Sequence, residues 1–360
     1  MKILQRYVLS ELILPFILCF LTLNFIFMGG YLVKAANFII GRSVPLLDTL
    51  YVLVLALPDM ISYTVPTSLL TAVLIVFGGF SQNNEIRAMK ASGIHAVHIM
   101  LPALMVGLAA SLVMFVFNDQ VATNARFELR KATKKMLIKH PMAIIEPGRF
   151  VKLDEGITFL AKQLDGRKMR DIVAYENEGG DKPVRTIIAE RGEIVVSPEE
   201  TEMQIRLYDG SISDTEDASV QSIQFETYEF PSLGQEDIRN MQKKKRDLTL
   251  AEILVNLEAG YNSDEDEREL TGAFHQRIAF SLGSFIFAFM GIPIAMIVRR
   301  GEIIFSFAIA MGAACIYYIL FVGAKTVAVH GIVPDLAAFW VPNILLMLLA
   351  THLCRISIRT

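Results

Sequence analysis

The sequence predicts an α+β membrane protein in which six transmembrane helices, three and three, flank an inserted antiparallel β-domain. Three observations predict this fold class. Hydrophobic residues make up 53% of the 360 residues and the mean hydropathy is +0.45, which is too apolar for an ordinary soluble protein. Six apolar runs approach the roughly 20 residues that cross a bilayer. Between the third and fourth runs, the hydrophobic period changes to two, as in β-strands.

The six apolar runs are nearly free of charged residues. They are Leu12–Val33, Met60–Phe80, Ile99–Phe117, Ile278–Val298, Ile303–Ala324 and Leu336–Leu353. Only the last contains an ionisable side chain other than cysteine or tyrosine, His352, near its end. Lys2 and Arg6 precede a first run that is too long for a cleaved signal peptide, so we expect it to be retained as a span.

The orientation follows from the distribution of Lys and Arg, which are enriched in cytoplasmic connections. With the N-terminus inside, the cytoplasmic pieces contain Lys2, Arg6, Arg87, Lys90, Arg299, Arg300, Arg355 and Arg359. The short outer pieces contain Lys34, Arg42 and Lys325. We therefore expect both termini to be cytoplasmic and the large polar block to be outside.

The polar connection Ser81–Gly93, between the second and third runs, has the pattern of a small capped helix over residues 82–93. Asn84 is a candidate N-cap, Glu85 suits the first turn, and Gly93 suits the position after the C-cap. Three residues at i, i+3, i+4 spacing would share one face: Ile86, Met89 and Lys90. Such an element is either a loop that satisfies its own backbone or a coupling helix that docks into another protein.

Charged residues near three of the predicted spans have two interpretations each. Lys34, after the first span, is an interfacial anchor or a contact for an anionic lipid. Asp59 is an interfacial helix cap or a group for ion or proton coupling, and the cap is favoured because no other predicted span offers an acidic partner. A helix continuing from the third span carries Arg126, Arg130, Lys131, Lys134, Lys135 and Lys139. This basic stripe is a solvated face or a contact for an anionic headgroup.

Short strands separated by turn residues follow this basic helix. They are predicted at Ile157–Gln163, Asp171–Glu176, Val184–Ala189, Glu193–Ser197, Glu202–Tyr208 and Ser219–Phe230. Turns are predicted at Asp165-Gly166, Gly179-Gly180 and Asp209-Gly210. The even spacing, without intervening helices, is typical of an open antiparallel sandwich or jelly roll.

The domains are accordingly predicted at residues 1–139, 140–247 and 248–360, the middle one being the β-domain with its linker. Thr249 and Glu252 form a capping box that opens a short helix, which should stop near Gly260.

No catalytic, metal or cofactor site is predicted. The sequence lacks the GxxxxGK[ST] loop that holds nucleotide phosphates, and also HExxH, CxxC and GxSxG. Its six histidines are scattered, and its three cysteines lie in or at the end of apolar segments. A net charge of −3 argues against a nucleic-acid partner. Any ATP-driven activity would therefore need a separate ATPase.

Several motifs in order resemble the lipopolysaccharide export permeases LptF/LptG, also called YjgP/YjgQ. They are Glu85–Ile94 in the polar connection, Pro58-Asp59 and Pro66 in the second span, His275-Gln276-Arg277 with Gly291-Ile292-Pro293 in the fourth, and Pro334 with Trp340–Asn343 in the sixth. The three, domain, three layout extends this resemblance over essentially the whole chain.

The resemblance implies a permease subunit in the bacterial inner membrane with a periplasmic β-jelly roll. Its implied partners are a sister subunit (LptG or LptF), two copies of the cytoplasmic ATPase LptB, LptC and lipopolysaccharide. The coupling helix would contact the ATPase through Glu85, Ile86, Arg87, Met89 and Lys90. The phosphorylated sugars of the lipid would contact Lys34, Arg126, Arg130 and Lys325, and Lys325 favours LptF over LptG.

Three other readings compete with this one. A lipoprotein-releasing or other lipid-export permease usually carries its large outer domain after the first span, whereas here it follows the third. A membrane scaffold would not require the basic residues at the membrane surface. A membrane hydrolase would need a nucleophile and a base that the sequence does not bring together.

Overall fold

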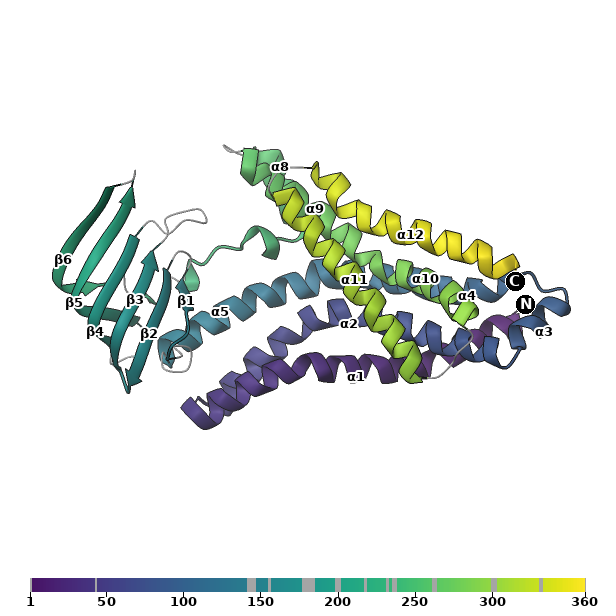
Figure 1. Ribbon diagram of the computed structural model, residues 1–360, viewed down its shortest axis with the longest axis horizontal. Coiled ribbons are helices and arrows are strands. Elements are labelled where there is room, and N and C mark those ends of the chain that lie inside the picture. The colour runs from purple at the N-terminus through teal and green to yellow at the C-terminus, as the bar shows by residue number, and fades with distance from the viewer. Residues whose placement is uncertain are drawn as a thin grey trace. The chain divides into compact units, whose positions relative to one another are not determined.

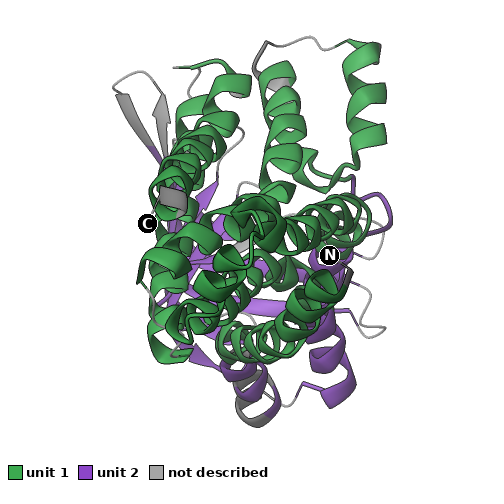
Figure 2. Ribbon diagram, turned by 90° about the vertical axis from the view of Figure 1, so that its right-hand side faces the viewer, with its two compact units in different colours: residues 1–31, 55–127, 243–360 green, residues 32–54, 128–242 purple. Residues whose placement is uncertain are grey.

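The computed structural model describes residues 2–42, 44–140, 147–154, 157–176, 185–197, 202–216, 219–230, 233–234, 238–260, 264–298, 303–329 and 333–359. It contains long helices and an antiparallel sheet that lies between them in chain order, which confirms the α+β fold class (Figure 1). The chain divides into two compact units (Figure 2). Unit 1 comprises residues 1–31, 55–127 and 243–360, and unit 2 comprises residues 32–54 and 128–242.

Six helical segments among the described residues are long and apolar enough to cross a membrane, as predicted. The helices that form them are α1 (Lys2–Arg42), α2 (Leu46–Gln82), α4 (Ala96–Val116), α10 (Gly283–Val298), α11 (Ile303–Val329) and α12 (Asp335–Arg359). The third segment continues from α4 through a π-helix, η1 (Phe117–Ala122), into α5 (Thr123–Lys139). The fourth begins in α9 (Asp264–Ser281) and continues into α10.

Helix α10 is largely buried and packs against α4 and α12. Its close contact with α4 requires a glycine, because a Cβ atom on Gly107 would lie 2.7 Å from the Cβ of Ala288. Phe287 of α10 is fully buried beside Tyr317 of α11, their ring centroids being 5.1 Å apart. Small residues at helix contacts and large side chains beside them are the usual way in which membrane helices pack.

The third span is longer than its apolar run, and this overturns one prediction. The run ends at Phe117, but the helix continues and the π-helix buries Asn118 and Asp119. Contrary to the prediction that no span other than the second offers an acidic residue, the third span contains Asp119. A hydropathy profile scores a carboxylate as polar whether or not it is paired in the folded chain. It therefore ended the predicted span before Asp119.

The inserted sheet is antiparallel, and its strands from β1 to β6 pair in sequence order, while β7 pairs with β5. The strands are β1 (Val151–Asp154), β2 (Ile157–Asp165), β3 (Lys168–Glu176), β4 (Arg185–Val196), β5 (Glu202–Glu216), β6 (Ser219–Glu229) and β7 (Leu233–Gly234). Alternate residues on one face, among them Phe159, Ile172, Ile187 and Ile205, form a buried cluster, which explains the period of two. The order of the described strands is that of a meander, without the crossing connections of a jelly roll.

Two details of the strand prediction were wrong. The segments predicted as Val184–Ala189 and Glu193–Ser197 belong to one strand, β4, which starts at Arg185. The predicted turn at Asp209-Gly210 lies inside β5, where Asp209 has a φ of 53° and the register of the pairing with β4 is the same on both sides of it. The Asp165-Gly166 turn is confirmed between β2 and β3. Gly179-Gly180 falls outside the described residues.

Candidate functional site

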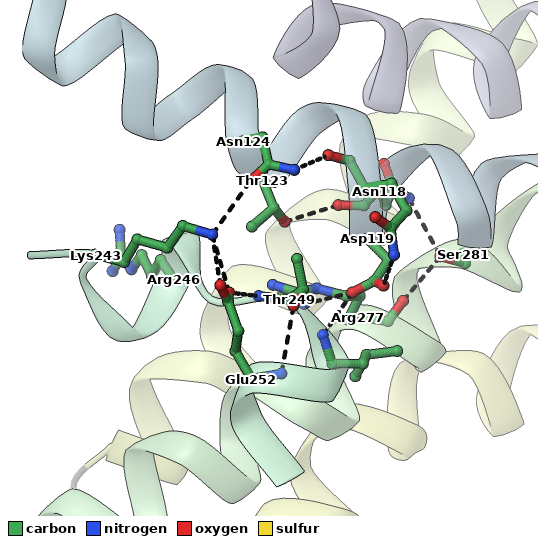
Figure 3. A network of polar contacts seen from close by, with 12 residues as sticks. Asn118, Asp119, Thr123, Asn124, Lys243, Arg246, Thr249, Glu252, Arg277 and Ser281 are labelled. Atoms are coloured by element: carbon green, nitrogen blue, oxygen red, sulfur yellow. Dashed lines mark hydrogen bonds and ion pairs between the residues drawn. The ribbon is translucent and has the colours of Figure 1, made fainter. Parts of the chain in front are cut away.

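A network of polar side chains lies inside unit 1 around the π-helix η1 (Figure 3). Asp119 Oδ1 accepts hydrogen bonds from Arg277 Nη1 of α9 at 2.8 Å and from the backbone N–H of Leu250 at 2.7 Å. The Arg277 and Asp119 side chains are only 7% and 10% exposed. A buried charge pair of this kind needs every partner in place, because removing one leaves an uncompensated charge.

Asn118 joins three helical segments through the same network. Its Oδ1 accepts from Ser62 Oγ of α2 at 2.7 Å, and its Nδ2 donates to Ser281 Oγ of α9 at 3.2 Å. The hydroxyl of Thr123 donates to the backbone carbonyl of Asn118 at 2.9 Å, so that this carbonyl in the π-helix has a partner. The irregular turn is therefore stabilised by its own side chains.

The start of helix α8 (Leu250–Ala259) is held by a capping box and a lysine. Thr249 and Glu252 form the predicted box, and Gly260 is the C-cap, so both predictions are confirmed. Lys243 Nζ donates to Glu252 Oε1 at 2.7 Å and to Asn124 Oδ1 at 3.2 Å. Burial by itself would raise the pKa of Glu252, but the hydrogen bonds from Lys243 and Thr249 outweigh it and lower the pKa below its ordinary value.

A pocket of about 270 Å³ lies beside this network, within unit 1. Its charged lining residues are Asp59 of α2, Arg126 of α5, Arg246 of the short 3₁₀ turn η2 (Lys245–Asp247), Arg277 of α9 and Lys325 of α11. Four cations against one carboxylate give the lining a formal charge of +3. This excess of positive charge favours an anionic ligand.

Aromatic side chains line the same pocket beside the cations. Tyr63, Phe280, Tyr318 and Phe321 contribute to it. The Tyr63 ring meets Phe280 and Tyr318 edge-on, at centroid distances of 5.2 and 5.3 Å. Tyr318 OH donates to the backbone carbonyl of Tyr63 at 2.9 Å, which fixes the position of its ring. The pocket therefore combines positive charge with rigid, largely apolar walls, as an amphiphilic anion would require.

Asp59 does not cap a helix, contrary to the prediction. It lies inside α2, and its Oδ1 accepts from Arg126 Nε at 2.6 Å. Arg126 also donates through Nη1 to the backbone carbonyl of Arg246 at 3.3 Å. The sequence could not show this pairing, since the two partners are 67 positions apart.

Of the four predicted lipid contacts, Arg126 and Lys325 line this one pocket. Arg130 belongs to unit 2, where its Nη2 donates to the backbone carbonyl of Gln242 at 3.4 Å. Lys34 lies in α1, and its side chain is outside the described part of the structure. Arg246 and Arg277 were not predicted as contacts. The sequence did contain a signal for Arg277. An arginine at the start of a predicted span is costly to place in a membrane unless it is paired or functional.

The polar connection between the second and third spans contains the short helix α3 (Glu85–Ala91), so the predicted helix is confirmed. Gly93 has a φ of 83°, and the backbone bonds Gly93 N to Lys90 O and Ile94 N to Met89 O close a Schellman motif. The predicted N-cap bond is absent among the described contacts: Asn84 is left-handed and its side chain accepts from Arg87 Nη1 instead.

The predicted ATPase-contacting residues lie on different sides of α3. Ile86 is 5% exposed and Met89 is partly buried, and both pack in the hydrophobic core of the chain itself. Lys90 Nζ donates to the Ser357 carbonyl of α12 at 3.4 Å. Glu85, half-buried, accepts from Tyr7 OH of α1 at 3.1 Å. Arg87 is exposed.

Among the described residues, no group of three or more His, Cys, Asp or Glu side chains is placed to hold a metal ion.

Comparison with known proteins gives two findings. A family model described as "Lipopolysaccharide export system permease LptF/LptG" matches residues 6–355. A protein of Rickettsia prowazekii (strain Madrid E), named only as uncharacterized, is 23% identical over 147 residues. That alignment covers 41% of this chain and 41% of the relative, so it extends over less than half the length of either.

Proposed function

Because the chain belongs to the lipopolysaccharide export permease LptF/LptG family, we propose that it is the membrane-spanning subunit that takes lipopolysaccharide out of the inner membrane. A separate cytoplasmic ATPase drives this step, and a periplasmic bridge receives the lipid. The chain itself binds and moves the lipid, and it does so without catalysing a reaction.

The observation that carries the proposal is the cationic pocket beside aromatic walls. Lipopolysaccharide combines phosphate groups on sugars with acyl chains. The phosphates match Arg126, Arg246, Arg277 and Lys325, and the rings of Tyr63, Phe280 and Phe321 offer an apolar surface next to them. Arginine is well suited to phosphate because its planar donors bind two oxygens at once. Arg130 and Lys34 remain further candidate contacts.

The partners follow from the family. We assign two copies of LptB, a sister subunit of the same family, and LptC as partners, with both termini and α3 cytoplasmic and the sheet periplasmic. The five residues proposed to contact the ATPase divide by burial. We propose that exposed Arg87 and half-buried Glu85 contact the ATPase directly, whereas Ile86 and Met89, which pack in the core, hold α3 on the permease. Lys90 fastens α3 to the end of α12.

The experiment measures lipopolysaccharide bound to the purified complex when single pocket cations are neutralised. Arg246→Gln and Lys325→Gln should each weaken binding about 10-fold or more, since charge-assisted hydrogen bonds contribute roughly 1.5–3 kcal/mol. Arg355→Gln is the matched control: it removes an exposed arginine of α12 that does not line the pocket. Unchanged binding in both pocket variants would disprove this assignment of the site.

A further inference from the structure

The four pocket cations differ in whether they form an ion pair with a carboxylate of the chain. Arg277 pairs with Asp119, and Arg126 pairs with Asp59. The side chains of Arg246 and Lys325 form no hydrogen bond or ion pair with any described residue. An anionic ligand therefore meets two cations that have no carboxylate in direct contact among the described residues, and two that have one.

The two resident carboxylates are held very differently. Asp119 is buried and is also fastened by the backbone N–H of Leu250 and by Gln120 Nε2. Asp59 is 43% exposed, lines the pocket itself, and has Arg126 as its one hydrogen-bond partner among the described residues. Asp119 is thus a fixed part of the fold, whereas Asp59 can turn away when another anion takes its place.

The geometry of Arg126 shows what an arriving phosphate would compete for. A guanidinium binds two oxygens best along one edge, through Nε and the neighbouring Nη2. Asp59 occupies Nε, and the carbonyl of Arg246 occupies one position on Nη1. Nη2 has no partner among the described residues. A phosphate can reach Nη2 with Asp59 in place, but it gains the full edge only when Asp59 leaves.

We infer that Asp59 is a built-in counter-ion that competes with the lipid for Arg126 and so sets how quickly the lipid is released. This inference rests on the proposed function of the pocket. With Asp59 present, Arg126 is paired whether the pocket is empty or full, and the departing phosphate is replaced by a carboxylate instead of leaving a bare charge. A transporter must release the lipid that it binds. The competing carboxylate lowers the affinity of the pocket for the lipid and thereby makes release faster.

A purely structural role makes the opposite prediction. If Asp59 only orients Arg126, removing the charge of Asp59 leaves the guanidinium without a fixed orientation, and binding of the lipid weakens. The direction of the change in affinity therefore separates the two roles, and dissociation rates separate them more sharply than occupancy does, because release is the step that Asp59 controls.

The experiment uses the full chain purified with its partner subunits in lipid nanodiscs. The probe is fluorescently labelled lipopolysaccharide carrying two phosphates, chased with unlabelled lipid to measure dissociation. Asp59→Asn, which keeps the shape of the side chain, should slow dissociation about tenfold, because it removes one like charge from the phosphate site. During turnover, Asp59→Asn should lower two quantities of the ATPase assay. One is the lipid concentration that gives half-maximal stimulation, and the other is the maximal rate of ATP hydrolysis. The change in dissociation rate should shrink at high salt.

Three variants make the test decisive. Asp59→Glu keeps the charge and should restore fast release. Asp59→Ser supplies a second neutral side chain if the asparagine variant does not accumulate. In an Arg126→Gln background, Asp59→Asn should change dissociation little, because Asp59 acts through Arg126. Unchanged or faster dissociation in both neutral variants overturns the inference. If that result comes with weakened binding in Lys325→Gln, the proposed pocket stands and only the role of Asp59 fails.

Discussion

Removing the carboxylate of Asp119 should destabilise the helical unit more than any other single charge change described here. Its Oδ1 holds Arg277 Nη1 at 2.8 Å and the N–H of Leu250 at 2.7 Å, in a site that is almost closed to solvent. Asp119→Ala leaves the arginine buried without a counter-charge, which costs about 3–5 kcal/mol. Asp119→Asn keeps a hydrogen-bond acceptor at the same place but also leaves the arginine without a counter-charge, so its cost should lie at the lower end of this range, about 3 kcal/mol.

Denaturation of the purified chain in mixed micelles with increasing SDS gives the free energy of unfolding for each variant. The double variant Asp119→Leu with Arg277→Met removes both charges and should recover most of the loss. About 1–3 kcal/mol should remain, because the N–H of Leu250 still lacks its acceptor. That variant should nevertheless bind lipopolysaccharide weakly, since Arg277 also lines the pocket. If Asp119→Ala unfolds at the same SDS fraction as the parent chain, the pair does not stabilise the fold as argued.

Three further predictions follow from other contacts. Gly107→Ala should destabilise the chain by about 1–3 kcal/mol in the same SDS assay, because its Cβ would lie 2.7 Å from that of Ala288. Gly79→Ala is the control, with no atom within 4 Å of its Cβ, and equal effects of the two would refute the argument. The folded-state pKa of Glu252 is lowered, so its contribution to stability is present above its unfolded pKa of about 4.3 and is lost as the pH falls through the folded value. In the parent chain, hydrogen exchange of the first turn of α8 should therefore accelerate at acid pH, relative to the intrinsic exchange rate. In Glu252→Gln the exchange should already be fast, and its pH dependence should be that of the intrinsic rate. Glu85→Ala should lower recovery of the ATPase on pull-down of the tagged chain, whereas Arg355→Gln should not; full recovery with Glu85→Ala would argue against α3 as the docking helix.

Much of the architecture was readable from the sequence because it depends on local patterns. The six spans follow from the lengths of apolar runs such as Met60–Phe80, and α8 follows from the reciprocal capping of Thr249 and Glu252. Gly93 marked the end of α3 because a left-handed residue is needed there. These features arise within a few neighbouring residues, so an isolated segment carries the information.

The strand pattern was readable only in part, for a related reason. Alternation places Phe159 and Ile172 on the buried face, and the sequence shows it. Whether the chain turns at Asp209 depends on the neighbouring strands, because the pairing of β5 with β4 and β6 continues on both sides of that residue. A turn and a left-handed residue inside a continuous strand have the same local signature, and only long-range pairing distinguishes them.

By itself, the sequence determined the membrane spans, the inserted sheet and the short helices, and its resemblance to the permease family pointed to two of the cations that meet in the pocket, Arg126 and Lys325. Only the tertiary structure decided that Asp59 pairs with Arg126, that Asp119 is buried against Arg277, and that Arg246 joins the same pocket. The physical reason is that the cost of a charge in a membrane protein depends on its partner, and these partners are 67 to 158 positions apart along the chain. Hydropathy scores each residue by its own solvation, whereas a paired charge is stabilised by a neighbour that folding alone brings to it.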